Sequence, residues 1–166
     1  MPLPLKSLSK DAIPRALSKA ERYRLLNEPL GAVSICLDIL AVEPENQQAL
    51  VTLVLAMTDE FAHGYKLEDG RPEDVVGRLE GEYERAYYSG ILAERRAEAI
   101  LDQSAPGAAF IAHDLLSTAM RHYEQAERLR PPGNDDALLR WNTCVRLMNS
   151  RGVKPPADDV DELPVE

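Results

Sequence analysis

Cysteine is scarce in this sequence, since Cys36 and Cys144 are the only two among 166 residues. Each lies within an apolar pattern of helical spacing, and two such residues do not supply a disulfide framework or a paired-cysteine zinc motif. We therefore expect two buried, reduced thiols and a cytoplasmic protein. Long apolar runs are also missing: none approaches the roughly 20 residues of a membrane span, and residues 1–11 lack the apolar core of a signal peptide.

Strand-like alternation is absent as well, and positive charge is in the minority. Lys and Arg number 19 against 28 Asp and Glu, which leaves a net charge of −9. Such a surface repels phosphate backbones, so we expect neither nucleic acid nor a membrane among the partners. With 45% hydrophobic residues, however, the chain can bury the core of one domain.

Apolar residues are instead spaced at steps of three and four, which is typical of amphipathic helices. These patterns predict an all-α domain over residues 11–150, preceded by a proline-punctuated arm (1–10) and followed by a disordered acidic tail (151–166). Three helices are expected between residues 11 and 62, a long one over 72–103 that could break near Gly81, and two more over 108–130 and 135–149. Ser9, Asn46 and Asn134 stand where capping residues are favoured. The helix over 108–130 is expected to bury Ile111, Leu115, Ala119, Tyr123, Ala126 and Leu129.

Two stretches each carry aromatic, small and proline residues, at different positions of one repeat pattern. The first is marked by Tyr23, Ala32 and Pro44, and the second by Ala119, Tyr123, Ala126 and Pro131. Both resemble the tetratricopeptide repeat (TPR), a helix–turn–helix unit of about 34 residues in which small side chains let two helices approach closely. The sequence departs from the family at Ala20, where glycine is usual, and at Cys36, where an aromatic residue is usual.

The resemblance implies antiparallel helix hairpins stacked as a right-handed array, with the last helix covering the open end. It also implies a non-catalytic adaptor or scaffold that binds a peptide or helix of a partner protein in a concave groove. Asn142 would hold the backbone of the bound peptide, unless it makes a buried side-chain hydrogen bond instead. Carried over by position, the partner-binding residues are Leu17, Glu21, Arg24, Gln48, Val51, Leu55, Leu138 and Asn142.

Two other functions are considered. One is a self-associating structural subunit, a homo-oligomer whose groove is filled by another copy. The other is a small helical metal-binding protein or enzyme that uses His63, His113 and His122. Glu60 and His63 have the Glu-x-x-His spacing of di-iron bundles, but the second such motif is missing. His113 and His122 project about 180° apart on one helix, so we expect no catalytic residue, metal or other cofactor.

Some aromatic and charged residues allow more than one interpretation. Tyr83 and Tyr87 share one helix face, either as half-buried core residues or as contacts for a ligand. The charged run 94–98 is interpreted as a solvated face, unless Arg95 anchors a buried carboxylate. Trp141 is expected to be a packing anchor in the last helix.

Overall fold

A computed structural model describes residues 1–64 and 70–155, and every regular element in this part of the chain is helical. The all-α class is therefore confirmed, and none of the described helices is both long and apolar enough to cross a membrane. Most of the predicted acidic tail, residues 156–166, lies outside the described residues. In chain order the elements are η1 (Lys10–Ala12), α1 (Ile13–Leu25), α2 (Pro29–Val42), α3 (Gln47–Asp59), η2 (Phe61–His63), α4 (Pro72–Gly77), α5 (Glu82–Gln103), α6 (Ala108–Leu129) and α7 (Asp136–Arg151), where η marks a 3₁₀ helix.

Local chemistry explains where several helices begin. Proline occupies one of the first two positions of α1, α2 and α4, where a backbone N–H is not needed. Asn46 caps α3 as expected, because its side-chain oxygen accepts a hydrogen bond from the Ala49 backbone N–H at 2.9 Å. Asn134 accepts a hydrogen bond from the Asp136 N–H at 3.0 Å, but the N-cap position of α7 is occupied by Asp135 rather than by Asn134. The cap expected at Ser9 is wrong, since this residue makes no capping bond and precedes only η1.

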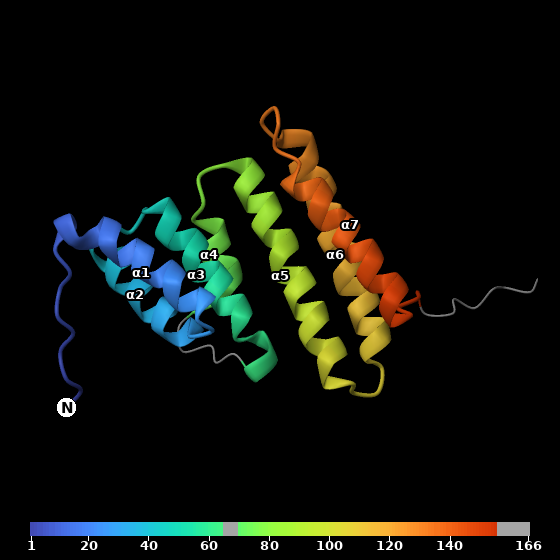
Figure 1. Ribbon diagram of the computed structural model, residues 1–166, viewed down its shortest axis with the longest axis horizontal. Helices are drawn as coiled ribbons and strands as arrows, with labels where there is room; N and C mark the ends of the chain where they lie inside the picture. Colours follow the sequence, from blue (N-terminus) through green and yellow to red (C-terminus); the bar gives the residue numbers. More distant parts are fainter. Residues whose placement is uncertain (65–69, 156–166) are drawn as a thin grey trace, which may run out of the picture.

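The helices lie side by side in chain order from one end of the molecule to the other (Figure 1). Each α-helix contacts the next one along the chain, from α1 with α2 to α6 with α7. Alternate helices also meet, because α1 contacts α3 and α3 contacts α5. These contacts place α1, α3 and α5 in one row, and we call this row the α1–α3–α5 row.

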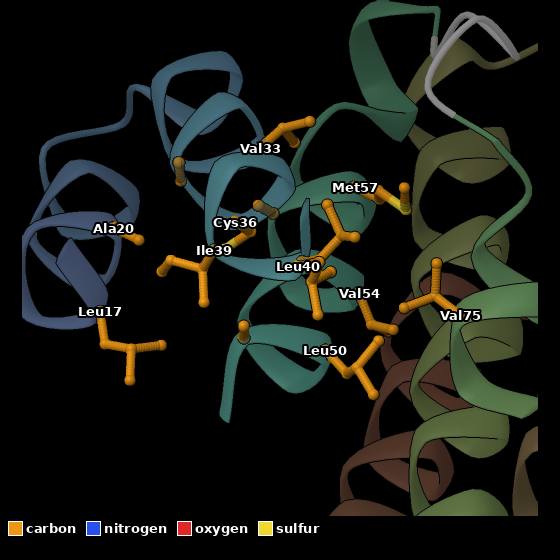
Figure 2. Packing of buried hydrophobic residues seen from close by; sticks show 14 of the residues in the cluster. Leu17, Ala20, Val33, Cys36, Ile39, Leu40, Leu50, Val54, Met57 and Val75 are labelled. Carbon is orange, nitrogen blue, oxygen red and sulfur yellow. The ribbon is translucent and has the colours of Figure 1, made fainter. Parts of the chain in front are cut away.

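Two hydrophobic clusters fill the space between the helices. The first draws mainly on α1 to α4, and Figure 2 shows its aliphatic side chains together with Cys36. The second draws on α5, α6 and α7. Tyr88 packs against both clusters and Leu55 of α3 packs against the second, so the two clusters are joined through α3 and α5.

Small residues lie where the repeat pattern predicts close helix contacts. Ala32, Ala119 and Ala126 are all 0% exposed, which confirms that they face neighbouring helices. α5 and α6 also approach closely at Gly90, where a Cβ atom would come within 2.5 Å of Cε1 of the Tyr123 ring. The missing side chain at Gly90 therefore makes room for a fully buried aromatic ring between two long helices.

The stretch 72–103 is not one continuous helix but two, α4 and α5, separated by residues 78–81. Gly81 precedes α5 and has an extended backbone. The break that the sequence allowed near Gly81 is therefore confirmed. Arg85 stabilises the break, because its Nη1 donates hydrogen bonds to the backbone oxygens of Leu79 and Glu80 at 2.7 and 2.8 Å. The turn buries Leu79 in the first cluster.

The buried face of α6 differs from the predicted one at both of its ends. Ala112 and Leu116 are fully buried, whereas Ile111 is 53% exposed and Leu129 is 40% exposed. The middle of the predicted face, from Ala119 to Ala126, is buried as expected. The difference follows from how close α6 lies to α5, since an alanine fits against the neighbouring helix where a larger isoleucine does not.

Candidate functional site

The α1–α3–α5 row carries two pockets that contain residues expected to bind a partner. The first, of about 490 Å³, lies between α1 and the start of α3 and is lined in part by Leu17, Glu21 and Gln48. The second, of about 320 Å³, lies between the ends of α1 and α3 and the C-terminal half of α5, and Arg24 lines it. The structure therefore brings four of the eight predicted residues to adjoining parts of one surface.

An ion pair between α1 and α3 forms one side of the second pocket. Arg24 Nε donates to Asp59 Oδ2 at 2.8 Å, and its Nη2 donates to Asp59 Oδ1 at 3.3 Å. Such two-point pairing fixes the orientation of the guanidinium group. Arg24 was expected to bind a peptide directly, and in this structure its first partner is Asp59, with which it shapes the pocket.

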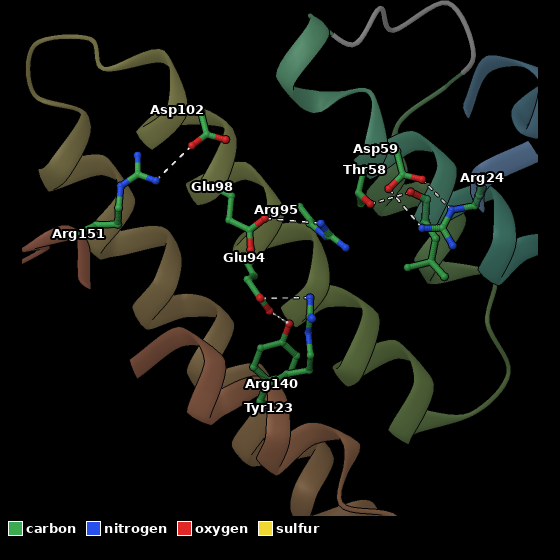
Figure 3. A network of polar contacts seen from close by, with 11 residues as sticks. Arg24, Thr58, Asp59, Glu94, Arg95, Glu98, Asp102, Tyr123, Arg140 and Arg151 are labelled. Atoms are coloured by element: carbon green, nitrogen blue, oxygen red, sulfur yellow. Dashed lines mark hydrogen bonds and ion pairs between the residues drawn. The ribbon is translucent and has the colours of Figure 1, made fainter. Parts of the chain in front are cut away.

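The other side of the second pocket is formed by α5 and is also charged. Arg95 lies 3.6 Å from Glu98 through its Nη1, and Asp102 lies 3.3 Å from Nη1 of Arg151 in α7. Figure 3 shows these pairs along α5, with the Arg24 pair across from them. Arg95 therefore does not anchor a buried carboxylate, and a segment bound here would meet acidic and basic groups in alternation.

The remaining four predicted residues have different surroundings. Val51 and Leu55 are half-buried on α3, where they pack against the first and the second cluster. Leu138 and Asn142 lie on α7, each two residues from Arg140, the side chain that reaches α5. Two residues correspond to about 200° of helical rotation. Both therefore project from another side of α7, and neither lines the two pockets.

Trp141 and Asn142 are neighbours with different roles. Trp141 packs against the second cluster, and its Nε1 donates to Oε1 of Glu124 at 3.2 Å, which confirms the expected packing role. Asn142 is half-buried, and its side chain forms no hydrogen bond within residues 1–64 and 70–155. The buried hydrogen bond considered for Asn142 is therefore not present among these residues.

Sequence reasoning missed a buried ionisable network at the meeting point of α5, α6 and α7. The Glu94 side chain is 0% exposed, although the run 94–98 was interpreted as a solvated face. Tyr123 Oη donates to Glu94 Oε2 at 2.5 Å, and Arg140 Nη2 lies 3.1 Å from Glu94 Oε1 (Figure 3). One side chain comes from each of the three helices, so the network ties α7 to the α5–α6 pair.

A signal for this network was present in the sequence. Glu94 lies at helical steps from Ala86, Gly90, Ala97 and Leu101, and all of these residues are buried. A carboxylate on a helix face made of small and apolar residues is buried with them, and a buried carboxylate requires a charged or hydrogen-bonding partner.

The pKa values of the network follow from burial and from its internal contacts. Burial raises the pKa of Glu94, while the hydrogen bond from Tyr123 and the charge of Arg140 act in the opposite direction. Burial and the neighbouring carboxylate both raise the pKa of Tyr123, so its phenol stays protonated and remains a donor. Burial lowers and the Glu94 charge raises the pKa of Arg140, with a net upward shift. The network therefore holds a paired charge, and Glu94 lines neither of the two pockets.

The tyrosines of α5 form an aromatic group beside this network. Tyr83 and Tyr87 stack with ring centroids 5.9 Å apart, and Tyr87 meets Tyr88 edge-to-face at 5.1 Å. The Tyr87 ring is also 5.9 Å from that of Tyr123. All three α5 tyrosines pack against the second cluster, and burial raises the pKa of Tyr88 to about 12. The structure favours the core interpretation of this group over the ligand-binding one.

The histidines and cysteines occupy separate places. His63 is exposed at the end of η2, while His113 and His122 are half-buried on α6. Cys36 and Cys144 are free thiols buried in different clusters, as expected. Within the part of the chain that the structure describes, no group of three or more His, Cys, Asp or Glu side chains is arranged to hold a metal ion.

Comparison of the chain with models of known protein families, with curated proteins and with solved structures found no match in any of the three. The functional interpretation therefore depends on the arrangement of the helices and on the chemistry of the α1–α3–α5 row.

Proposed function

We propose that this protein is a non-catalytic interaction module, a TPR-like adaptor or scaffold. It binds a peptide or a helix of a partner protein along the α1–α3–α5 row and needs no metal or other cofactor. The observation that carries the proposal is the contact of α1 with α3 and of α3 with α5. In a stack of helix hairpins, the first helices of successive pairs meet in this way and line one surface.

In this proposal α1 pairs with α2, α3 with α4 and α5 with α6, stacked in a right-handed array, and α7 covers the end. Two close approaches support the pairing of first and second helices: a Cβ at Gly31 of α2 would lie 2.7 Å from the Tyr23 ring of α1, and Gly90 meets Tyr123 in the same way. The second pair departs from the pattern, because α4 has only six residues.

The chemistry of the first pocket suits a peptide. Leu17 contributes an apolar floor and is only 9% exposed, while Glu21 and Gln48 are exposed at the rim. A floor of this kind receives an apolar side chain, and the rim groups hydrogen-bond to peptide N–H and C=O groups. In the second pocket, the Arg24–Asp59 pair and the charged residues of α5 would orient the next segment of the bound peptide.

The test uses a partner first isolated by capture on the wild-type protein. Its dissociation constant is then measured by calorimetry with Glu21→Arg and Gln48→Arg, and with Gln125→Arg, an exposed α6 position, as the matched control. We expect each row variant to weaken binding about tenfold, which is about 1.4 kcal/mol, and the control to bind normally. Row variants that bind like wild type, or a control that binds as weakly as they do, would contradict the proposal.

Self-association is the second candidate function, and one observation favours it. Leu25, Leu26 and Leu30 are 87%, 61% and 64% exposed around the turn between α1 and α2. A second copy that covered this apolar turn would remove it from water. Light scattering from dilute to concentrated solution separates the two functions, because a constant monomer mass excludes the homo-oligomer.

A further inference from the structure

The N-terminal segment of this acidic protein carries a net positive charge. Residues 1–25 contain six Lys and Arg against two Asp and Glu, whereas the remaining 141 residues contain 13 against 26. The helix within the basic segment is α1, which lies at the opposite end of the molecule from α6 and α7 (Figure 1). Residues 108–151, which contain α6 and α7, carry six Lys and Arg against five Asp and Glu, so the acidic excess lies in residues 26–107 and 152–166.

Three of these cations share one face of α1. Arg15, Lys19 and Arg22 are separated by steps of four and three, and all three are exposed. Together with Ser18 and Tyr23 they line a pocket of about 360 Å³. We call this surface the basic face.

The three cations of the basic face line neither pocket of the α1–α3–α5 row. Each of these cations comes two positions before a residue of α1 that lines one of the row pockets. Two positions correspond to about 200° of rotation around a helix. The contrast is clearest between Arg22 and Arg24, because Arg24 turns toward α3 and pairs with Asp59. The pocket on the basic face and the first row pocket share only Ser18, so the two surfaces meet at that residue and are otherwise lined by different side chains.

The cations of the basic face have no acidic partner within residues 1–64 and 70–155. Lys19 instead places its Nζ 5.6 Å from the centroid of the Tyr23 ring. That ring lies directly on the backbone of α2, since a Cβ at Gly31 would be 2.7 Å from its Cδ2. The face thus combines three uncompensated charges with an aromatic floor held in place by the neighbouring helix.

We propose that the basic face is a second docking surface that binds an acidic segment of a partner protein. Arg15 and Arg22, at the two ends of the basic face, each pair with a carboxylate of the segment through two hydrogen bonds, and Lys19 contributes a third positive charge between them. Seven residues of helix span about 10 Å, so the matching segment presents about three carboxylates over that length. Charge complementarity favours this occupant, because the face presents three cations that have no acidic partner among the described residues.

Nucleic acid fits the same surface less well. Three cations supply fewer phosphate contacts than the roughly 6–10 made by proteins that bind duplex DNA tightly. The rest of the chain, with twice as many acidic as basic residues, repels a long phosphate backbone. A short acidic segment covers less of the surface outside the basic face, so it meets less repulsion from the acidic residues there.

The test measures fluorescence anisotropy of a fluorescein-labelled peptide of eight glutamates in low salt with the full chain. The variant R15Q/K19Q/R22Q removes the basic face. The matched control R71Q/R128Q/R146Q removes three other exposed arginines that also lack an ion pair with any described residue. Circular dichroism confirms that both triple variants keep their helices.

We expect the peptide to bind wild type and the control equally, and to bind R15Q/K19Q/R22Q at least tenfold more weakly. Raising the salt concentration should weaken wild-type binding to the level of that variant. Absence of binding to wild type, or an equal loss in both triple variants, would overturn the proposal. Tighter binding of an octamer of deoxythymidine than of the peptide, lost in R15Q/K19Q/R22Q, would overturn the choice of an acidic segment in favour of nucleic acid.

Discussion

Replacing Gly90 with alanine tests whether close helix contacts hold this array together. The added Cβ would lie 2.5, 2.7 and 2.9 Å from three atoms of the Tyr123 ring. Real Cβ atoms do not approach other atoms so closely, so α5 and α6 must move apart or the ring must turn. The ring is constrained, because Tyr123 is 0% exposed and its hydroxyl is bound to Glu94.

Two opposing effects determine how far Gly90→Ala changes the free energy of unfolding. Alanine is favoured over glycine inside a helix by about 1 kcal/mol, which stabilises the variant. Overpacking a well-filled core costs typically about 1–3 kcal/mol, and the rigid surroundings of Tyr123 place Gly90→Ala toward the upper end. We expect the free energy of unfolding to fall by about 1–2 kcal/mol in total, which lowers the melting temperature by a few degrees in a chain of this length.

The assay is equilibrium denaturant unfolding followed by circular dichroism, with Gly77→Ala as the matched control. A Cβ at Gly77, the last residue of α4, meets nothing within 4 Å. That variant should be unchanged or more stable by up to about 0.5 kcal/mol. If Gly90→Ala is as stable as Gly77→Ala, α5 and α6 do not pack as closely as described, and the packing argument is refuted.

Three further predictions concern the polar and sulfur groups. Burial raises the folded-state pKa of Glu94, so the contribution of Glu94 to stability is fully present below its unfolded pKa of about 4.3 and is lost as pH rises through its folded pKa. The difference in unfolding free energy between wild type and Glu94→Gln should therefore fall over that pH window. A difference that does not depend on pH would contradict this prediction. Burial raises the pKa of both Cys36 and Cys144 to about 12. A thiol reagent at pH 8 should therefore modify these cysteines readily only in denaturant. Rapid labelling of the native protein would contradict their burial. Asp59→Asn leaves Arg24 without its partly buried carboxylate and should lower the free energy of unfolding by about 1 kcal/mol in denaturant titrations, whereas unchanged stability would mean that the pair contributes little.

Much of the fold could be predicted from local patterns. The alanines at Ala32 and Ala119 and the cap at Asn46 all act over a few residues, and the structure has them as expected. The sequence left open whether 72–103 is continuous or breaks near Gly81, because the bonds from Arg85 that stabilise the break depend on the three-dimensional turn.

The candidate site could be predicted only in part. Leu17 and Gln48 line one pocket, as their positions in the repeat pattern indicate. Asn142 does not join them, because α7 packs against α6 and its Arg140 reaches Glu94 of α5. That contact joins residues 46 positions apart on different helices, and the spacing along either helix alone does not reveal it.

Site-specific crosslinking tests the central claim, that the α1–α3–α5 row binds the partner, most directly. A photoreactive phenylalanine is placed at Gln48 in the row, and in a second protein at Gln125 on α6 as the control; both positions are exposed. The account predicts that Gln48 forms a crosslink to one defined peptide of the captured partner and that Gln125 does not. A crosslink from Gln125 alone, or equal crosslinks from both positions, would contradict it.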